Sequence, residues 1–373
     1  MSQNSEYKGY EEFLKAYEGR LENSGYDNKP KTETVRASVP ARKKKKRYRV
    51  IRLRKSAVAV LLILIVAITS IFVVPWDSFS KKSDAKNSKA SVSKSDSTPK
   101  KEETGISYSF SKDTVAIPNY VDAKGAIIID KTDNSVVAQR NAHERTYPAS
   151  TTKIMTLLVA VERIDDLSDT FTMTLSITDP MFEAGASVAG FLNGEVITMK
   201  DMLYGLILPS GADAALGLAT KIAGSEENFV KLMNKKVKEL GLKNTNFANV
   251  TGLHDKNNYS TAYDMAIILD AALQNELCRE VLSTYQYTTA STKEHPQGIL
   301  LSSTLFSWMY GTEPETATIL GGKTGFVNES GYCIASYGKA NDTENEYIVV
   351  TLGNSGRWPA FYGQIDLYKD FAK

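Results

Sequence analysis

A serine and a lysine three positions apart, Ser150 and Lys153, stand at the start of an apolar segment that we expect to be helical. That spacing places both side chains on one face of a helix. A serine hydroxyl becomes nucleophilic when a base accepts its proton, and a lysine amine can be that base if its charged form is disfavoured. The start of a helix disfavours positive charge and offers free backbone N–H groups that can hold an oxyanion. The pair therefore predicts a serine nucleophile for acyl transfer.

On its own, a Ser-x-x-Lys pattern is weak evidence, because a capping serine followed by a surface lysine is the ordinary explanation. Two later segments change that balance. Ser210 begins a Ser-Gly-Ala triplet within ILPSGADAALGLA, and a Lys-Thr-Gly triplet lies within LGGKTGFVNESGYCIAS. The small residues around Lys323 let a substrate backbone lie against a strand edge. Lys323 can supply positive charge for a carboxylate, and Thr324 can donate a hydrogen bond from its hydroxyl.

Histidine and cysteine are too scarce for most other catalytic centres. The three histidines, His143, His254 and His295, form no HExxH or HxxxD pairing, so a Ser-His-Asp triad is poorly supported and we expect neither a metal nor a cofactor. Cys278 and Cys333 show no CxxC spacing. One disulfide between them is an alternative outside the membrane, and two buried free thiols are the interpretation that we favour.

The N-terminal part of the chain divides into segments of contrasting composition. Residues 1–55 are polar and end in the run ARKKKKRYRVIRLRK, whereas residues 56–75, SAVAVLLILIVAITSIFVVP, carry no charge. About 20 apolar residues are enough for a helix to cross a bilayer, and flanking positive charge keeps its side in the cytoplasm. We therefore predict a cytoplasmic disordered tail at 1–55, a single transmembrane helix at 56–75, a flexible extracytoplasmic linker at 76–107 and an extracytoplasmic catalytic domain at 108–373.

Two alternatives apply to the same segment. A cleavable signal peptide would usually have a shorter apolar region followed by a small-x-small site, and the apolar run here is long and preceded by a long tail. A basic run alone can bind nucleic acid, but this one directly precedes the apolar segment. We therefore favour an uncleaved anchor in the cell membrane and expect no nucleic-acid partner.

The segment from residue 108 onward indicates an α+β fold. GAIIID and NSVVAQRN are β-like runs joined by a hairpin signal, and strand-like runs return late in ATILGGKTGFV, YCIASYGK and EYIVVTLGN. Strands at both ends with helices between them predict one antiparallel sheet beside a helical lobe. Helical patterns cover residues 150–164, 199–222, 226–240, 263–274 and 358–371.

From about Val115 to its end, the sequence resembles the serine-type D-alanyl-D-alanine carboxypeptidases, which are low-molecular-weight penicillin-binding proteins. That family carries S-x-x-K, S-x-N and K-T-G in this order. The surroundings PASTTKIMT, LPSGADAA, TGLHDKNNYSTAYDMA and GGKTGFVNESG also fit. The resemblance implies the transpeptidase fold that penicillin-binding proteins share with serine β-lactamases. It has an antiparallel five-stranded sheet flanked by helices, and an all-helical lobe with the site in the cleft between them.

The implied activity is removal of the last D-Ala from peptidoglycan stem peptides that end in D-Ala-D-Ala, through an acyl-enzyme on the serine. The family resemblance also implies covalent trapping by β-lactam antibiotics. Carried over by motif, Ser150 would be the nucleophile and Lys153 its general base. Ser210 would relay protons between the lysines and the leaving amine.

The resemblance implies a substrate-binding role for the third motif and its surroundings. Lys323 and Thr324 would hold the terminal carboxylate, with Gly325 completing the motif. Phe326, the next residue, would supply the second oxyanion N–H. Arg357, in GNSGRW, lies near where relatives place an arginine close to the substrate carboxylate. A solvated surface arginine is the alternative for Arg357.

One position departs from the family pattern, because Ala212 stands where the second motif normally ends in Asn. An Asn amide can bind both the base lysine and a substrate carbonyl, and alanine can do neither. A water or another polar side chain must then replace it, or turnover is reduced. Asp213 points about 100° away along a helix, so we expect it to be structural. His254 is expected to be a loop residue near the cleft and not a catalytic one.

Two other functions remain open at this point. A serine β-lactamase shares the fold and the first and third motifs, but no E-x-x-L-N string typical of class A enzymes is present. A degenerate member would bind stem peptides without cleaving them, and only Ala212 supports that reading. The sequence therefore favours a membrane-anchored carboxypeptidase whose chain ends without a second, β-rich domain.

Overall fold

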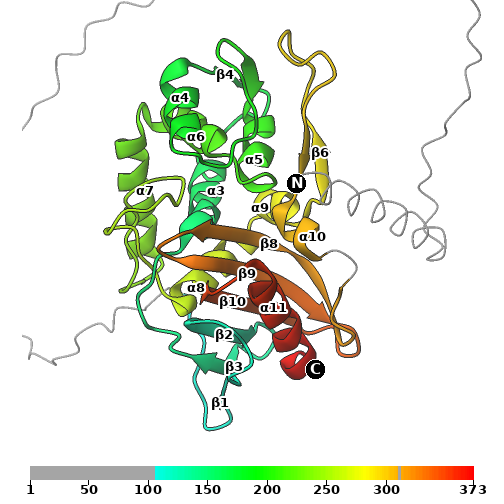
Figure 1. The fold of residues 1–373 in the computed structure, drawn as a ribbon. Coiled ribbons are helices and arrows are strands. Elements are labelled where there is room, and N and C mark those ends of the chain that lie inside the picture. The colour runs from blue at the N-terminus through cyan, green and yellow to red at the C-terminus, as the bar shows by residue number, and fades with distance from the viewer. Residues whose placement is uncertain (1–105, 310–311) are drawn as a thin grey trace, which may run out of the picture. The chain divides into compact units, whose positions relative to one another are not determined.

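A six-stranded sheet combines strands from both ends of the part of the chain that this computed structural model describes, residues 106–309 and 312–373 (Figure 1). The strand order is β1-β3-β2-β10-β9-β8. The strands are Val115–Ala116 (β1), Gly125–Asp130 (β2), Ser135–Arg140 (β3), Ala317–Val327 (β8), Gly331–Ala340 (β9) and Glu346–Asn354 (β10). The long strand-like runs of the sequence thus form one sheet, as predicted.

The prediction of a five-stranded, purely antiparallel sheet is wrong in one respect. The sheet is mixed, because β1 adds a sixth strand that pairs in parallel with β3, Val115 lying opposite Ala138. β1 is only two residues long and both are exposed, so it carries no apolar alternation that a sequence pattern could reveal. Two small hairpins lie outside this sheet: Thr170–Thr172 (β4) with Val196–Thr198 (β5), and Gln286–Thr288 (β6) with Leu300–Ser302 (β7).

The central strand β10 is buried on both of its faces. Ile348 and Val350 belong to the core shared with the helical lobe, whereas Tyr347 and Val349 belong to a second core. Helix Ala262–Leu273 (α8) packs on the first face and helix Arg357–Phe371 (α11) covers the second (Figure 1). Because alternate residues of a strand point to opposite faces, this double burial requires apolar residues at nearly every position of β10.

Most of the remaining helices form a lobe that connects to the sheet through Lys153–Val161 (α3) (Figure 1). Thr304–Met309 (α10) is the exception, because it contacts β8 and α11. A short 3₁₀ turn, Ala149–Thr152 (η1), precedes α3 and contacts β8 and β9, so this helix begins against the edge of the sheet. The other helices are Leu175–Glu183 (α4), Met199–Ile207 (α5), Ala212–Ala223 (α6), Glu226–Glu239 (α7), Glu276–Ser283 (α9) and Thr304–Met309 (α10).

The sequence predicts one helix over residues 199–222, and this prediction is wrong at residues 208–211, where α5 ends and α6 has not begun. Pro209 has no N–H to continue a helix, and Ser210 has a φ of 65°, in the left-handed region. The Gly211 N–H donates to the carbonyl of Gly205 at 2.9 Å, which closes the chain into a tight turn. The break places Ser210 between two helix ends and not on a helix face.

The predicted cytoplasmic tail at 1–55, the predicted transmembrane helix at 56–75 and almost all of the predicted linker at 76–107 lie outside the described residues. Within residues 106–309 and 312–373, no helix combines the length and the apolar character needed to cross a bilayer. The two cysteines lie within the described part, Cys278 in α9 and Cys333 in β9, and both are buried free thiols, as favoured from the sequence.

The turn at Gly211 generates a stability prediction. A Cβ at Gly211 would lie 2.6 Å from the Gly205 carbonyl oxygen and 2.8 Å from an Asp213 carboxylate oxygen, so Gly211→Ala should lower the free energy of unfolding by about 1–3 kcal/mol. Gly363→Ala, on α11, is the control because its nearest neighbour would be a Val121 methyl at 3.3 Å. Urea denaturation measures both variants. Equal losses in the two would show that the turn is not constrained as described.

Candidate active site

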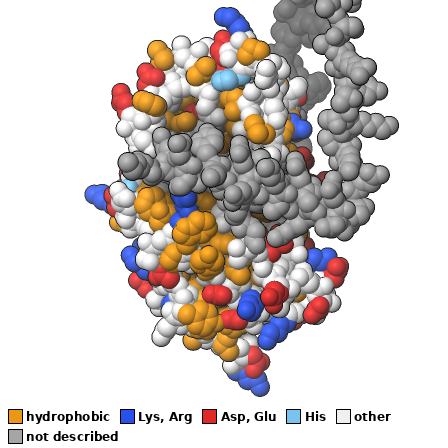
Figure 2. All heavy atoms as spheres, turned by 45° about the vertical axis from the view of Figure 1, so that its right-hand side comes forward, with side chains coloured by type: hydrophobic (Ala, Val, Ile, Leu, Met, Phe, Trp, Pro, Cys, Tyr) orange, Lys and Arg blue, Asp and Glu red, His pale blue; other side chains and the backbone are white. Residues whose placement is uncertain are grey.

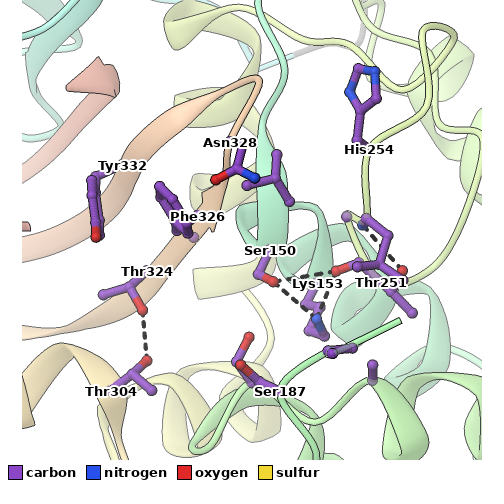
Figure 3. Close-up of a pocket in the computed structure, with 18 of the residues that line it drawn as sticks. Ser150, Lys153, Ser187, Thr251, His254, Thr304, Thr324, Phe326, Asn328 and Tyr332 are labelled. Carbon is purple, nitrogen blue, oxygen red and sulfur yellow. Dashed lines mark hydrogen bonds between the residues drawn. The ribbon is translucent and has the colours of Figure 1, made fainter. Parts of the chain in front are cut away.

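A cavity of about 560 Å³ opens where the helical lobe meets the β8 edge of the sheet (Figure 3). It brings together segments that are far apart in the sequence, from the start of α3 to the β8–β9 turn. One predicted site residue, Lys323, does not line it. The predicted site residues that do line the cavity are Ser150, Lys153, Ser210, Thr324, Gly325, Phe326 and Arg357.

Ser150 and Lys153 contact one another at the base of this cavity. The Lys153 amine donates to Ser150 Oγ at 3.1 Å and to the main-chain carbonyl of Thr251 at 2.6 Å (Figure 3). Ser150 Oγ lies 3.4 Å from the same carbonyl oxygen. A hydroxyl, an amine and a carbonyl therefore form a closed triangle, in which the amine is positioned to exchange a proton with the hydroxyl.

Two glycines fix the backbone on either side of Ser150. A Cβ at Gly325 would lie 2.8 Å from the Ser150 nitrogen, and a Cβ at Gly252 would lie 1.9 Å from the Ala149 carbonyl oxygen. Gly252 also has a φ of 82°, which a residue with a side chain rarely adopts. The absence of side chains at these positions lets β8 and the loop before Leu253 approach the nucleophile turn closely. The Ser150 N–H stands at the start of the helix, where it is available to an oxyanion.

The loop that supplies the Thr251 carbonyl is held by Asn249. The Asn249 side-chain oxygen accepts hydrogen bonds from the N–H groups of Thr251 and Gly252 at 3.2 and 2.7 Å, and its amide donates to the Leu253 carbonyl at 2.9 Å. No role for this carbonyl was predicted from the sequence. The segment TGLHDKNNYST fits the family pattern, but a main-chain carbonyl cannot be recognised from residue type.

Lys153 and Lys323 are both almost completely buried, with 2% and 1% of their surface exposed. In the described part of the chain, neither amine has a carboxylate within ion-pair distance. Burial lowers the pKa of Lys153 to about 7, and the more distant Asp213 carboxylate opposes that shift. Burial and then the charge of Lys153 lower the pKa of Lys323 well below its usual range. Both amines therefore lose their proton more easily than an exposed lysine does.

The third motif divides its residues between the cavity and the interior. The Lys323 amine donates to the Thr324 carbonyl at 2.7 Å behind the cavity wall. Thr324 faces the cavity, where its hydroxyl shares a 2.7 Å hydrogen bond with that of Thr304 from α10 (Figure 3). Ser210 also lines the cavity, and its hydroxyl makes no hydrogen bond to any described residue. Two hydroxyls and the space between them are thus available to a ligand.

Aromatic side chains form one rim of the cavity. Phe326 stacks on Tyr332 with ring centroids 4.3 Å apart, and Tyr332 meets Trp308 at 5.9 Å. The guanidinium of Arg357 lies 5.4 Å from the centre of the Trp308 ring, which holds it at the cavity mouth. Figure 2, whose view brings the α10 side forward, shows hydrophobic side chains gathered beside basic ones. No feature of the sequence predicted that Trp308 and Tyr332 line the cavity.

The second motif has a methyl group where the family pattern has an amide. Ala212 lines the cavity with 1% of its surface exposed, and its N–H donates to the Ser187 carbonyl at 2.8 Å. The Asp213 carboxylate turns away and accepts the N–H groups of residues 189–191 at 2.8, 3.0 and 3.3 Å. Asp213 thus fastens the loop that carries Ser187, in agreement with the structural role expected for it.

His254 lies at the cavity rim as an exposed loop residue. Its ring meets Tyr147 edge-on, with centroids 4.7 Å apart, and its side chain makes no hydrogen bond to the described residues. Within the described ranges, no group of three or more His, Cys, Asp or Glu side chains is arranged to hold a metal ion. The groups that the site offers a ligand are hydroxyls, two buried amines and backbone N–H groups.

Comparisons with known proteins agree with this geometry. The family described as D-alanyl-D-alanine carboxypeptidase matches residues 112–356. The D-alanyl-D-alanine carboxypeptidase DacF of Bacillus subtilis is 37% identical over 234 residues, which cover 63% of this chain and 58% of the relative. The chain thus spans less than two thirds of the length of that relative.

Solved structures show the same fold. A mutant of the Streptomyces K15 DD-transpeptidase matches with a TM-score of 0.62 and 28% identity, covering 68% of this chain and 99% of that one. Penicillin binding protein 5 from Haemophilus influenzae matches with a TM-score of 0.59 and 29% identity, covering 68% of this chain and 71% of that one. With the family match extending over more than half of its length, the chain belongs to the D-alanyl-D-alanine carboxypeptidase family.

Proposed function

We propose that the chain is a serine D-Ala-D-Ala carboxypeptidase that removes the terminal D-Ala from peptidoglycan stem peptides and is acylated by β-lactam antibiotics. The observation that carries this proposal is the position of the buried Lys153 amine, 3.1 Å from Ser150 Oγ. An amine with a pKa of about 7 is half deprotonated at neutral pH and can act as a base there. Membership of the D-alanyl-D-alanine carboxypeptidase family supports the choice of a peptide ending in D-Ala-D-Ala as the substrate.

The proposed reaction begins when neutral Lys153 takes the proton of the Ser150 hydroxyl. Ser150 Oγ then attacks the carbonyl carbon of the penultimate D-Ala, and the resulting oxyanion accepts hydrogen bonds from the N–H groups of Ser150 and Phe326. The C–N bond to the terminal D-Ala breaks as its nitrogen receives a proton through Ser210. A water molecule finally hydrolyses the ester on Ser150, which restores the hydroxyl.

The proposed carboxylate site explains the burial of Lys323. The carboxylate of the terminal D-Ala would lie against the Thr324 hydroxyl, with Gly325 allowing the peptide to run beside β8 and Arg357 at the mouth. This negative charge would favour protonation of the buried Lys323 amine behind Thr324. Lys323 would therefore gain a proton when the carboxylate binds and lose it when the carboxylate leaves, because the amine has no carboxylate partner among the described side chains.

We propose that the catalytic domain lies on the outer side of the cell membrane. The apolar segment at 56–75 would anchor the chain in the membrane, with its N-terminus in the cytoplasm. The support for this is the basic run beside that uncharged segment. Polymeric peptidoglycan lies on the outer side of that membrane, so a tethered domain would meet its substrate there.

One observation favours a second candidate, a member that binds stem peptides without turning them over. The buried methyl of Ala212 faces the cavity where an amide would otherwise hold the base lysine and a substrate carbonyl. The intact contact between Ser150 and Lys153 argues for the enzyme. An adduct assay separates the two candidates.

The first test incubates the purified full-length chain with a fluorescent penicillin and, separately, with a pentapeptide ending in D-Ala-D-Ala. We expect a stable adduct that survives denaturing electrophoresis, together with release of D-Ala, because both start from attack by Ser150. Ser150→Ala should abolish both signals. Rapid loss of the adduct without D-Ala release would indicate a β-lactamase, and no adduct would indicate the non-catalytic binder.

A second prediction concerns pH. Only neutral Lys153 can accept the Ser150 proton, and its neutral fraction grows as pH rises through the pKa of about 7. The rate constant of penicillin acylation should therefore rise about tenfold per pH unit well below 7 and level off above it. Stopped-flow measurement between pH 5.5 and 8.5 checks this. Lys153→Arg, which keeps its proton at every pH tested, should give no acylation; a flat wild-type profile would exclude Lys153 as the base.

A third prediction concerns Ala212→Asn. If the missing amide limits turnover, restoring it should raise the acylation rate constant severalfold, because the new amide can contact both Lys153 and the substrate carbonyl. Ala212→Leu serves as the control for size without hydrogen bonding and should not raise the rate. An unchanged or lower rate in Ala212→Asn would mean that another group already fills this role.

A further inference from the structure

Thr304 lines the cavity but belongs to none of the three sequence motifs. It is the first residue of α10, and its hydroxyl oxygen lies 2.7 Å from that of Thr324 (Figure 3). The contact joins a helix to the edge strand of the sheet. A second hydroxyl therefore stands directly beside the one to which the proposed function assigns the substrate carboxylate.

The backbone holds Thr304 between the second and third motifs. Its N–H donates to the carbonyl of Leu208 at 2.9 Å, two residues before Ser210. The next residue, Leu305, is 2% exposed and belongs to the core that α11 covers, and α10 as a whole packs against β8. The backbone hydrogen bond and the buried neighbour thus fix the place from which the Thr304 hydroxyl reaches Thr324.

The two hydroxyls carry two protons, and only one of these lies between their oxygens. Each hydroxyl has one proton to donate and two lone pairs to accept with. Neither makes a hydrogen bond to any other residue within 106–309 and 312–373. The second proton is therefore available to a ligand in the cavity.

An anion beside Thr324 sets the direction of the shared hydrogen bond. A carboxylate accepts hydrogen bonds and donates none. When the Thr324 hydroxyl donates to such a ligand, its oxygen becomes the acceptor in the shared bond and Thr304 becomes the donor. Hydrogen bonds in series polarise and strengthen one another. The bond from Thr324 to a charged acceptor is then stronger than a lone hydroxyl would make it.

We propose that Thr304 is a positioning residue of the proposed carboxylate site. Its hydroxyl donates to Thr324 Oγ and thereby directs the Thr324 proton towards the terminal carboxylate of the substrate. Thr304 acts through Thr324 and makes no contact of its own with the substrate. The proposal rests on the proposed carboxypeptidase function, because that function places a carboxylate at Thr324. Recognition of the C-terminus then depends on α10 as well as on the third motif.

The expected effect belongs to substrate binding and not to the chemical step. The carboxylate keeps its charge throughout the proposed reaction, so its hydrogen bonds contribute equally to the ground state and the transition state. Loss of such uniform binding raises KM and leaves kcat unchanged. A displaced Ser150 or Lys153 would lower kcat instead. The two parameters therefore separate a role at the carboxylate from a disturbance of the nucleophile.

The test measures D-Ala release by the full-length chain from acetyl-Ala-D-Ala-D-Ala. Thr304→Val, which replaces the hydroxyl by a methyl group of similar size, should raise KM by about twofold to tenfold, the range for one neutral hydrogen bond. Thr304→Ser keeps the hydroxyl and should restore the wild-type KM. If Thr304→Val does not fold, Thr304→Ala removes the same hydroxyl without adding volume and should raise KM in the same way.

A double-mutant cycle checks that Thr304 acts through Thr324. Thr324→Val should raise KM by about tenfold to a hundredfold, because it removes a hydrogen bond to a charged group. Adding Thr304→Val should raise KM no further, since the Thr304 proton then has no Thr324 oxygen to reach. A further rise equal to that in the single variant would show that the two threonines act independently, and would overturn the proposal.

Ser307→Ala is the matched control on the same helix. The Ser307 hydroxyl donates to the Ser303 carbonyl at 2.8 Å, and Ser307 does not line the cavity. This variant should leave KM unchanged, and an equal rise in it would show a general effect of α10 and contradict the proposal.

The remaining outcomes separate this proposal from the one it rests on. If wild type releases D-Ala, an unchanged KM or a lowered kcat in Thr304→Val would overturn the role of Thr304 and leave the carboxypeptidase standing. The absence of D-Ala release by wild type would overturn the proposed function, and the role of Thr304 with it.

Discussion

The burial of the Lys153 amine without a carboxylate partner is the constraint on which the rest of this site depends. Removal from water makes the charged form costly, and that cost brings the pKa down to about 7. The same burial removes most of the freedom of the long side chain, which is held between Ser150 Oγ and the Thr251 carbonyl. A partner carboxylate at ion-pair distance would keep the amine protonated and therefore unable to act as a base.

Close approach of backbones is the structural condition for that burial. The nucleophile turn is enclosed by β8 on one side and by the loop at Thr251 on the other, and glycines at 325 and 252 leave the necessary room. The core beneath is continuous with the helical lobe, since α3 is buried along almost its whole length. Ser150 therefore belongs at once to the sheet edge and to the lobe, which fixes its position more firmly than a loop could.

Much of this could be predicted from the sequence, for identifiable reasons. The long strands and most helices carry continuous apolar or periodic patterns, and Ser150 and Lys153 share a helix turn, so their contact follows from spacing. The break at Pro209 was missed because apolar residues continue on both sides of it, and β1 was missed because two exposed residues carry no pattern. The Thr251 carbonyl could not be found, since every residue has one and only the folded chain selects it.

The two buried amines also explain how the site can hold Lys323 protonated while Lys153 is neutral. The charge of Lys153 is among the causes that lower the pKa of Lys323, so a proton on Lys153 disfavours a proton on Lys323. A carboxylate placed at Thr324 under the proposed function adds the negative charge that the described site lacks. Because Lys323 lies directly behind Thr324, the proton is then stabilised there more than at Lys153. Substrate binding itself would thereby leave the amine beside Ser150 neutral, at the moment when a base is required.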